Sequence, residues 1–243
     1  MLKAETSSKI LTAEISEIFS SIQGEGPYLG SKQIFVRFGR CNMHCVYCDE
    51  LEKMKEENFF RISVESLLKE IGTLERSKGP HQSVSLTGGE PLFYTDFLER
   101  FLPRLKEQGF PVYLETNGTL PRQLSRVIAW CDVIAMDMKP VSSTGDRVWI
   151  KEHQSFLEIA AAKDVFVKVV VTAETAPEEV TACARLVQKV RPNTPFILQP
   201  QSELVGISQK ALSLIESKIF PSISQILPDI RVIPQMHKIW GVR

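Results

Sequence analysis

The stretch QIFVRFGRCNMHCVYC, residues 33–48, joins a strand-like run to a loop that carries three of the chain's five cysteines. The run at 33–38 is rich in β-branched and aromatic residues, which is typical of a strand. Cys41, Cys45 and Cys48 then follow with the spacing Cys-x-x-x-Cys-x-x-Cys. Thiols this close in sequence are too crowded for pairwise disulfides of ordinary geometry, and three of them cannot pair off. The loop therefore predicts thiolate ligands that converge on one soft metal centre.

Two kinds of metal centre suit three clustered thiolates. A structural zinc ion needs four ligands, but His44 directly precedes Cys45, and adjacent residues in a short loop rarely reach one tetrahedral ion. Cys131 precedes a strand-like run and Cys183 lies inside a helical segment, and both are interpreted as small buried hydrophobic residues. An iron-sulfur cubane normally takes four cysteines, so a chain that supplies three leaves one iron open. We favour the cluster and keep zinc as the alternative.

Apolar strand-like runs recur along the chain and alternate with segments of helical period. The expected strands span 33–38, 83–87, 111–116, 132–138, 165–171, 195–199 and 229–234. The expected helices span 63–77, 94–109, 120–130, 155–163, 177–190 and 208–220. This alternation predicts an α/β fold with a parallel sheet, which is either a full or partial barrel or an open doubly wound sheet. No Gly-, Pro- or Ser-rich linker divides the chain, so we expect one domain over residues 1–243.

Four short polar motifs stand at the ends of expected strands. They are TGGEP (87–91), ETNG (115–118), DMKP (137–140) and QPQS (199–202). Active sites of parallel α/β folds gather at the carboxyl ends of the strands. We therefore expect these motifs and the cysteine loop to face a common mouth.

Composition excludes several partners and locations. Lys and Arg total 29, as do Asp and Glu, so no bulk charge points to nucleic acid or an anionic membrane. No apolar run approaches the roughly 20 residues that would span a bilayer. The first residues lack the apolar core of a secretory signal, so we expect a cytoplasmic protein. In a reducing compartment, clustered thiols serve metal or redox chemistry more often than disulfides.

The cysteine loop together with TGGEP resembles the radical S-adenosylmethionine (SAM) enzymes. The resemblance implies a single-domain partial (β/α)6-type parallel barrel, a 4Fe-4S cluster on Cys41, Cys45 and Cys48, and SAM at the open iron. Glu90 would satisfy the ammonium of SAM. Read without the resemblance, Tyr47 is a ring that shields the loop from solvent and Lys139 is a surface lysine. The residues implied to bind the cofactor are Tyr47, Cys48, Asp49, Gly88, Gly89, Glu90, Asp137, Met138, Lys139, Gln199, Pro200, Gln201 and Ser202.

The chain resembles the family of 7-carboxy-7-deazaguanine synthases over nearly its whole length. The resemblance begins with SSIQGEGPYLGSKQIFVRFGRC (20–41), continues through the four motifs above and ends with VIPQMHKIWG (232–241). The resemblance implies radical ring contraction of 6-carboxy-5,6,7,8-tetrahydropterin to 7-carboxy-7-deazaguanine with loss of ammonia, in the 7-deazapurine (queuosine) pathway. The planar guanidinium of Arg37 would grip the substrate carboxylate; otherwise it is a polar residue on an edge strand. A lone histidine such as His237 is otherwise most often structural. The implied substrate contacts are Ile22, Gln23, Gly24, Arg37, Thr87 and His237.

Two positions depart from the family's pattern. Glu50 follows Cys-Asp where the family places a Ser or Thr that binds Mg²⁺. A carboxylate is a competent ligand for a hard cation, so we expect Glu50 either to bind Mg²⁺ or to signal a changed substrate. The family's proline near the chain end is missing from WGVR (240–243), so the sequence does not say what closes that side of the pocket.

The resemblance also implies an electron donor such as flavodoxin and a homodimer. Two other functions stay open. One is an activase that installs a glycyl radical on a partner protein, since such enzymes carry the same cysteine loop. The other is a zinc-stabilised interaction module without catalytic activity.

Overall fold

The computed structural model describes residues 11–48, 55–203 and 206–242. Within these ranges the strands form one nine-stranded sheet in the order β3-β1-β2-β4-β5-β6-β7-β8-β9. From β2 to β9 every neighbouring pair is parallel, whereas β1 is antiparallel to both β2 and β3. The strands are β1 (Thr12–Ile22), β2 (Lys32–Phe38), β3 (Phe60–Ser63), β4 (Ser83–Gly88), β5 (Val112–Thr116), β6 (Val133–Met138), β7 (Asp164–Val171), β8 (Phe196–Pro200) and β9 (Ile230–Val232).

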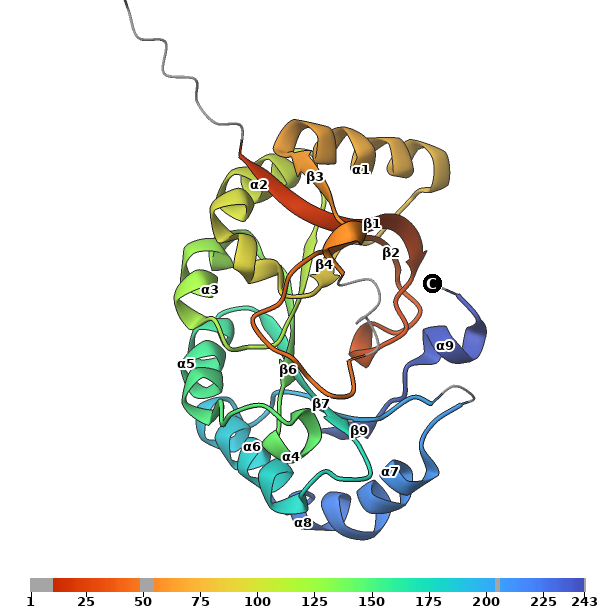
Figure 1. Cartoon of the computed structure of the whole chain (residues 1–243). Helices are drawn as coiled ribbons and strands as arrows, with labels where there is room; N and C mark the ends of the chain where they lie inside the picture. The colour runs from red at the N-terminus through yellow and green to blue at the C-terminus, as the bar shows by residue number, and fades with distance from the viewer. Residues whose placement is uncertain (1–10, 49–54, 204–205, 243) are drawn as a thin grey trace, which may run out of the picture.

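Most helices lie along the convex outside of the curved sheet, and the cysteine loop and the C-terminal helix lie on its concave side (Figure 1). The helices are α1 (Val64–Lys78), α2 (Thr95–Glu107), α3 (Pro121–Val127), α4 (Val141–Thr144), α5 (Ile150–Ala160), α6 (Pro177–Val190), α7 (Gln209–Leu214), α8 (Phe220–Ile223) and α9 (Met236–Trp240). Shorter helical turns are η1 (Gly26–Tyr28), η2 (Glu56–Asn58), η3 (Pro91–Tyr94), η4 (Ile128–Trp130) and η5 (Ile215–Ile219).

Helix α1 shows how the sequence sets these elements. The hydroxyl of Ser63 caps its first turn by accepting a hydrogen bond from the main-chain N–H of Ser66. Val64, Leu67, Leu68 and Ile71 are buried, at the spacing of three and four that forms one stripe of a helix. The apolar stripe packs on the sheet, so burial rather than propensity holds the helix in place.

The two faces of the sheet bury different side chains. Alternate residues of each strand point outward into the main hydrophobic core beneath the helices, for example Val165, Val167 and Val169 of β7. The other set points inward, where Tyr113, Ala135, Phe166 and Ile197 form a second, smaller apolar cluster. The inner cluster is the floor of the concave side, and the polar residues described below lie above it.

The observed fold confirms the predicted α/β class with an open parallel sheet, that is, a partial barrel. All seven expected strands and six expected helices are present within a few residues, except that the expected helix at 155–163 begins at Ile150 and the one at 208–220 includes the π-helical turn η5. Strands β1 and β3 were not predicted. In β1 the pairing with β2 shifts register between Ile15 and Glu17, which interrupts the alternation that marks a strand. In the described residues, no helix is both long and apolar enough to cross a membrane.

Candidate active site

A cavity of about 880 Å³ occupies the concave side of the sheet. Its volume falls within the usual range for small-molecule sites. Every strand from β1 to β8 except β3 contributes to its wall, as do the cysteine loop and residues after β9. The predicted common mouth is therefore present, although the cavity also reaches down the inner face of the sheet.

One inward position on each of six neighbouring strands carries a polar side chain that lines the cavity. Because strand residues alternate between the two faces, these side chains are separated from the helices by the sheet itself. Pairing places Arg37 beside Thr87 and Asp137 beside Lys168 on adjacent strands. From β2 through β8 this layer consists of Arg37, Thr87, Glu115, Asp137, Lys168 and Gln199.

The cysteine loop is held at the rim by hydrogen bonds to two neighbouring segments. The main-chain N–H of Val46 donates to the carbonyl of Thr144 at 3.0 Å. On the other side, the side-chain amide of Asn117 donates to Asn42 Oδ1 at 2.9 Å and lies 3.8 Å from Cys41 Sγ. All three cysteines of the loop line the cavity. The loop thus presents its thiols toward the space that a ligand would occupy.

Burial raises the pKa values of two of the loop thiols, Cys41 and Cys45. Burial, with the nearby carboxylate of Glu90, raises the pKa of Cys41 to about 11. Metal ligands of this kind lose their protons on binding. In the described part of the chain no three His, Cys, Asp or Glu side chains group closely enough to hold a single ion. In an iron-sulfur cluster each thiolate binds its own iron, so the donor set fits a cluster.

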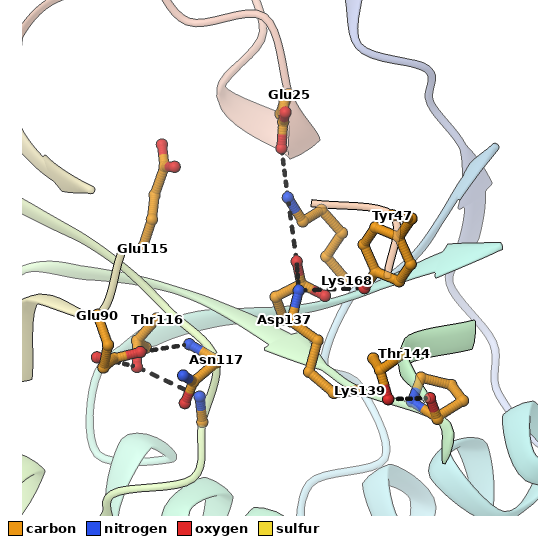
Figure 2. A network of polar contacts seen from close by, with 12 residues as sticks. Glu25, Tyr47, Glu90, Glu115, Thr116, Asn117, Asp137, Lys139, Thr144 and Lys168 are labelled. Atoms are coloured by element: carbon orange, nitrogen blue, oxygen red, sulfur yellow. Dashed lines mark hydrogen bonds and ion pairs between the residues drawn. The ribbon is translucent and has the colours of Figure 1, made fainter. Parts of the chain in front are cut away.

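A chain of alternating charges crosses the cavity (Figure 2). Lys139 Nζ lies 3.2 Å from the Tyr47 hydroxyl and 2.8 Å from Asp137 Oδ2. Lys168 Nζ lies 3.5 Å from the same Asp137 oxygen and forms an ion pair with Glu25. All four charged side chains are no more than 15% exposed. This row of alternating charges therefore links the cysteine loop, β6, β7 and the loop after β1.

The two lysines stay charged in spite of their burial. Burial disfavours the ammonium form of Lys139, but Asp137 raises its pKa well above the usual value. For Lys168, burial acts in the same unfavourable direction, and Glu25 and Asp137 together raise the pKa. Burial would raise the pKa of Glu25, yet the charge of Lys168 holds it below its usual value. The network is thus a set of compensated buried ions rather than neutral groups.

Glu90 of the TGGEP motif is fully buried and does not line the cavity. Its carboxylate accepts hydrogen bonds from the main-chain N–H groups of Leu92 (3.1 Å) and Asn117 (2.8 Å) and from the Thr116 hydroxyl (2.9 Å). Burial raises its pKa to about 7 against these hydrogen bonds. Glu90 therefore ties together the segments that follow β4 and β5, and Figure 2 shows it turned toward Thr116 and Asn117.

Glu115 holds a second polar cluster on the inner face. Its Oε1 accepts from Gln23 Nε2 at 2.9 Å and from the Ser85 hydroxyl at 3.2 Å, and its Oε2 accepts from the Thr87 hydroxyl at 2.7 Å. Gln23 also donates to Gln33 at 3.2 Å. A carboxylate with three donors has a fixed orientation, so Glu115 fixes the side chains of Gln23 and Thr87 at the cavity wall.

The C-terminal segment closes one side of the cavity against the loop after β1. The main-chain N–H of Met236 donates to the carbonyl of Gly24 at 2.9 Å, and Gln235 Nε2 donates to Glu25 Oε1 at 2.8 Å. His237 packs so closely on Gly24 that a Cβ there would lie 2.5 Å from the main-chain nitrogen of His237. Only glycine permits this approach. The sequence left this wall undefined, and residues 235–237 supply it.

Most predicted site residues that the structure describes line the cavity. The predicted ammonium ligand Glu90 does not, as described above, because its carboxylate is buried against Thr116 and Asn117. Met138 and Pro200 also do not: their side chains are buried, and the side chain of Met138 belongs to the core beneath the helices. A cofactor contact at these two positions would use main-chain atoms. Asp49 and Glu50 lie outside the described residues. The predicted residues along the cavity wall are Ile22, Gln23, Gly24, Arg37, Cys41, Cys45, Tyr47, Cys48, Thr87, Gly88, Gly89, Asp137, Lys139, Gln199, Gln201, Ser202 and His237.

Sequence reasoning missed Glu25, Glu115 and Lys168. Glu25 and Glu115 belong to motifs that were noted, QGEG and ETNG, but neither residue was given a role. Lys168 lies within VFVKVVV (165–171), which was predicted only as a strand. A single lysine in an otherwise apolar strand was the available signal, because such a charge needs a polar environment on one face.

Three buried side-chain atoms along the wall lack a hydrogen-bond partner among the described residues. They are Asp137 Oδ1, Gln199 Oε1 and Ser202 Oγ. Buried polar atoms are nearly always paired, so these atoms are expected to face a ligand or ordered water. All three belong to segments predicted to bind SAM, whose ammonium, hydroxyl and amino groups are suitable donors. The residues present therefore fit that cofactor.

Known proteins are similar to this chain over most of its length. A family model for the radical SAM superfamily matches residues 35–185. The 7-carboxy-7-deazaguanine synthase of Geobacter sulfurreducens is 37% identical, over 94% of this chain and 97% of the relative. The synthase of the same name from Methanothermobacter thermautotrophicus is 34% identical, over 96% of this chain and 99% of the relative.

Solved structures show the same fold. The crystal structure of QueE from Escherichia coli superposes with a TM-score of 0.64 at 21% identity, covering 92% of this chain and 94% of QueE. The structure of Streptococcus suis SuiB bound to S-adenosylmethionine gives 0.53 at 17% identity, covering 82% of this chain and 48% of SuiB. Together with the sequence relatives, these findings show that the chain belongs to the radical SAM superfamily and, within it, to the 7-carboxy-7-deazaguanine synthase family.

Proposed function

We propose that this chain is a radical SAM lyase that converts 6-carboxy-5,6,7,8-tetrahydropterin to 7-carboxy-7-deazaguanine with loss of ammonia, in the 7-deazapurine (queuosine) pathway. The two relatives of that name described above align with 94% and 96% of this chain. The observation that carries the proposal is that the three loop cysteines and Arg37 line one cavity. That cavity can hold a metal cluster and an anionic small molecule together.

Cys41, Cys45 and Cys48 would hold the 4Fe-4S cluster. When bound, the reduced cluster and SAM together would supply the radical chemistry that removes a hydrogen atom from the substrate. The chain's own residues bind and orient the cofactor: Asp137, Gln199 and Ser202 offer their unpartnered oxygens to its donor groups. We propose that Tyr47, Lys139 and the other predicted cofactor residues that line the cavity complete this half of it.

Arg37 is prepared to bind a carboxylate on the substrate side. Its Nε lies 3.2 Å from Glu17 Oε2, and its guanidinium lies 5.7 Å from the centre of the Phe19 ring. Phe19 stacks on Phe35 with ring centres 5.2 Å apart, and both rings line the cavity. The flat pyrimidinone ring of the tetrahydropterin suits an aromatic wall, and the fork of Arg37 suits the substrate carboxylate. Glu115 would orient Gln23 and Thr87 toward the same substrate.

Several finer assignments remain proposals that rest on the sequence. We propose Mg²⁺ as a further cofactor with Glu50 as its ligand, and a single domain over residues 1–243. The continuous sheet, whose strands run from Thr12 to Val232, supports one domain. An external electron donor such as flavodoxin, a homodimer and a cytoplasmic location are also predicted.

Product analysis tests the proposed function directly. The protein is reconstituted with iron and sulfide without oxygen, reduced, and incubated with SAM and 6-carboxytetrahydropterin. We expect 7-carboxy-7-deazaguanine and 5′-deoxyadenosine by mass spectrometry, and neither from Cys48→Ala. Cys131→Ala is the matched control, since Cys131 is buried in the core and should leave iron binding intact. Failure to bind iron would favour the zinc module, and SAM cleavage that requires a partner protein would favour an activase.

A further inference from the structure

Lys168 stands between two carboxylates that belong to different halves of the cavity. Its Nζ pairs with the carboxylate of Glu25 and lies 3.5 Å from Asp137 Oδ2. The Lys168 side chain is 14% exposed, and each acid is 15% exposed. One buried cation is therefore shared by two buried anions (Figure 2).

On the Asp137 side, the contacts lead to the predicted cofactor half. Asp137 Oδ2 also accepts from Lys139 Nζ at 2.8 Å, and Lys139 reaches the Tyr47 hydroxyl of the cysteine loop at 3.2 Å. The second oxygen of Asp137 is buried and has no partner among the described residues. A donor group of a ligand that binds this oxygen would stabilise the Asp137 carboxylate and weaken its attraction for Lys168.

On the Glu25 side, the contacts lead to the predicted substrate half. Glu25 Oε1 accepts from Gln235 at 2.8 Å, and the adjacent Gly24 accepts from the main chain of Met236 at 2.9 Å. The pairing of Glu25 with Lys168 therefore helps to set the position of both segments that form this wall. A stronger pairing would hold them in one arrangement, and a weaker pairing would release them.

We propose that Lys168 is a positioning residue that couples the two halves, so that SAM and the pterin each bind more tightly when the other is present. A ligand that binds Asp137 weakens the attraction between Asp137 and Lys168. The ammonium of Lys168 then pairs more strongly with Glu25, and this pairing fixes the segments of the substrate wall. Because such coupling is reciprocal, the same factor must appear in both affinities. The identity of the two ligands rests on the proposed function, whereas the coupling rests on the position of Lys168.

The experiment measures binding to the reconstituted protein without reductant, so that no turnover occurs. The Kd of SAM is determined with and without saturating 6-carboxytetrahydropterin, and the Kd of the pterin with and without SAM. We expect each ligand to lower the Kd of the other by about tenfold, which is within the usual range for coupled sites. Lys168→Met should reduce the factor to about one, and Lys168→Arg should restore most of it. Lys189→Met, a loss of charge on the exposed face of α6, should leave the factor unchanged.

Removal of Lys168 leaves two buried acids together, which could prevent folding. The double variant Lys168→Met with Glu25→Gln keeps the net charge and should fold, with a coupling factor of about one. A coupling factor is a ratio within one variant, so general loss of stability does not change it. A coupling factor of one in the wild-type protein overturns the proposal. A coupling factor in Lys168→Met or in the double variant that equals the wild-type value also overturns it. If the wild type does not bind the pterin, the proposed function is overturned and the coupling with it.

Discussion

The main-chain N–H of Asn117 donates a 2.8 Å hydrogen bond to the buried carboxylate of Glu90, which joins the ends of two neighbouring strands. Asn117 in turn places its side-chain amide 3.8 Å from Cys41 Sγ. The acid of the TGGEP motif thus supports the cysteine loop from beneath. Its measurable effect should be on stability as well as on cofactor binding.

Replacement of Glu90 by alanine should lower the free energy of unfolding by about 3 kcal/mol, because it leaves buried donors without an acceptor. Glu90→Gln keeps one acceptor oxygen and should cost about 1 kcal/mol. Urea denaturation measures both values, with Glu107→Ala on the exposed face of α2 as the control. If Glu90→Ala reduced SAM affinity without loss of stability, Glu90 would act through a direct cofactor contact.

Replacement of Arg37 by lysine should raise the KM for the pterin about tenfold, because an ammonium cannot reproduce the two parallel hydrogen bonds of a guanidinium. SAM cleavage without pterin should change less than twofold, since Arg37 lies in the predicted substrate half. Steady-state kinetics and the rate of 5′-deoxyadenosine formation provide the two readouts. Equal losses in both would mark Arg37 as a structural residue.

Replacement of Gly89 by alanine should destabilise the protein by about 2 kcal/mol. A Cβ at this position would collide with the main-chain carbonyl oxygens of Gly39 and Arg40, which cannot easily move. Gly72→Ala in α1 is the matched control, because its Cβ would meet only the flexible end of Arg76 at 3.3 Å. That change should stabilise the helix by about 0.5–1 kcal/mol. The same sign for both variants in thermal denaturation would contradict the prediction.

His153 should make stability fall in mild acid. It is 2% exposed, and its Nε2 donates to the Asn117 carbonyl at 3.1 Å. Burial lowers its pKa from 6.5 to about 4, so between these values the unfolded chain binds a proton that the folded chain does not. The free energy of unfolding should therefore drop by up to about 3 kcal/mol as the pH falls from 6.5 to 4.

The variant His153→Gln keeps an N–H donor for the carbonyl but cannot titrate. Urea denaturation of the variant and the wild type across this pH range isolates the contribution of the histidine. The free energy of unfolding of the wild type minus that of the variant should be constant above pH 7. This difference should fall steadily as the pH is lowered toward 4. Parallel curves throughout would show that His153 binds its proton equally well in both states.

Periodicity was sufficient to predict the parallel strands, because each is a short apolar run between helices. It failed for β1, where a register shift near Ile15 breaks the pattern, and for β3, which has only four residues. Helix α9 was also missed, since five residues give too few turns to show a period. Local pattern therefore predicted the long elements, and tertiary pairing decides the short ones.

The site was predicted in part for a related reason. Motif resemblance assigns runs of consecutive residues, whereas a strand turns only alternate residues toward the cavity. Asp137 and Lys139 line it, while Met138 between them faces the core. The ion pair of Lys168 with Glu25 joins residues that are 143 positions apart, and no local pattern reports such a contact.

The C-terminal wall of the cavity, where Gln235 donates a hydrogen bond to Glu25, joins segments that are 210 residues apart in the sequence. At ribosomal speeds of about 5–20 residues per second, roughly 10 to 40 seconds of translation separate the emergence of these two segments. The thiols of Cys41, Cys45 and Cys48 are made at the start of that interval. Until residues 235–237 are synthesised, the cavity of a nascent chain therefore lacks this wall, and its interior is more open to iron, sulfide and oxidants than in the finished protein.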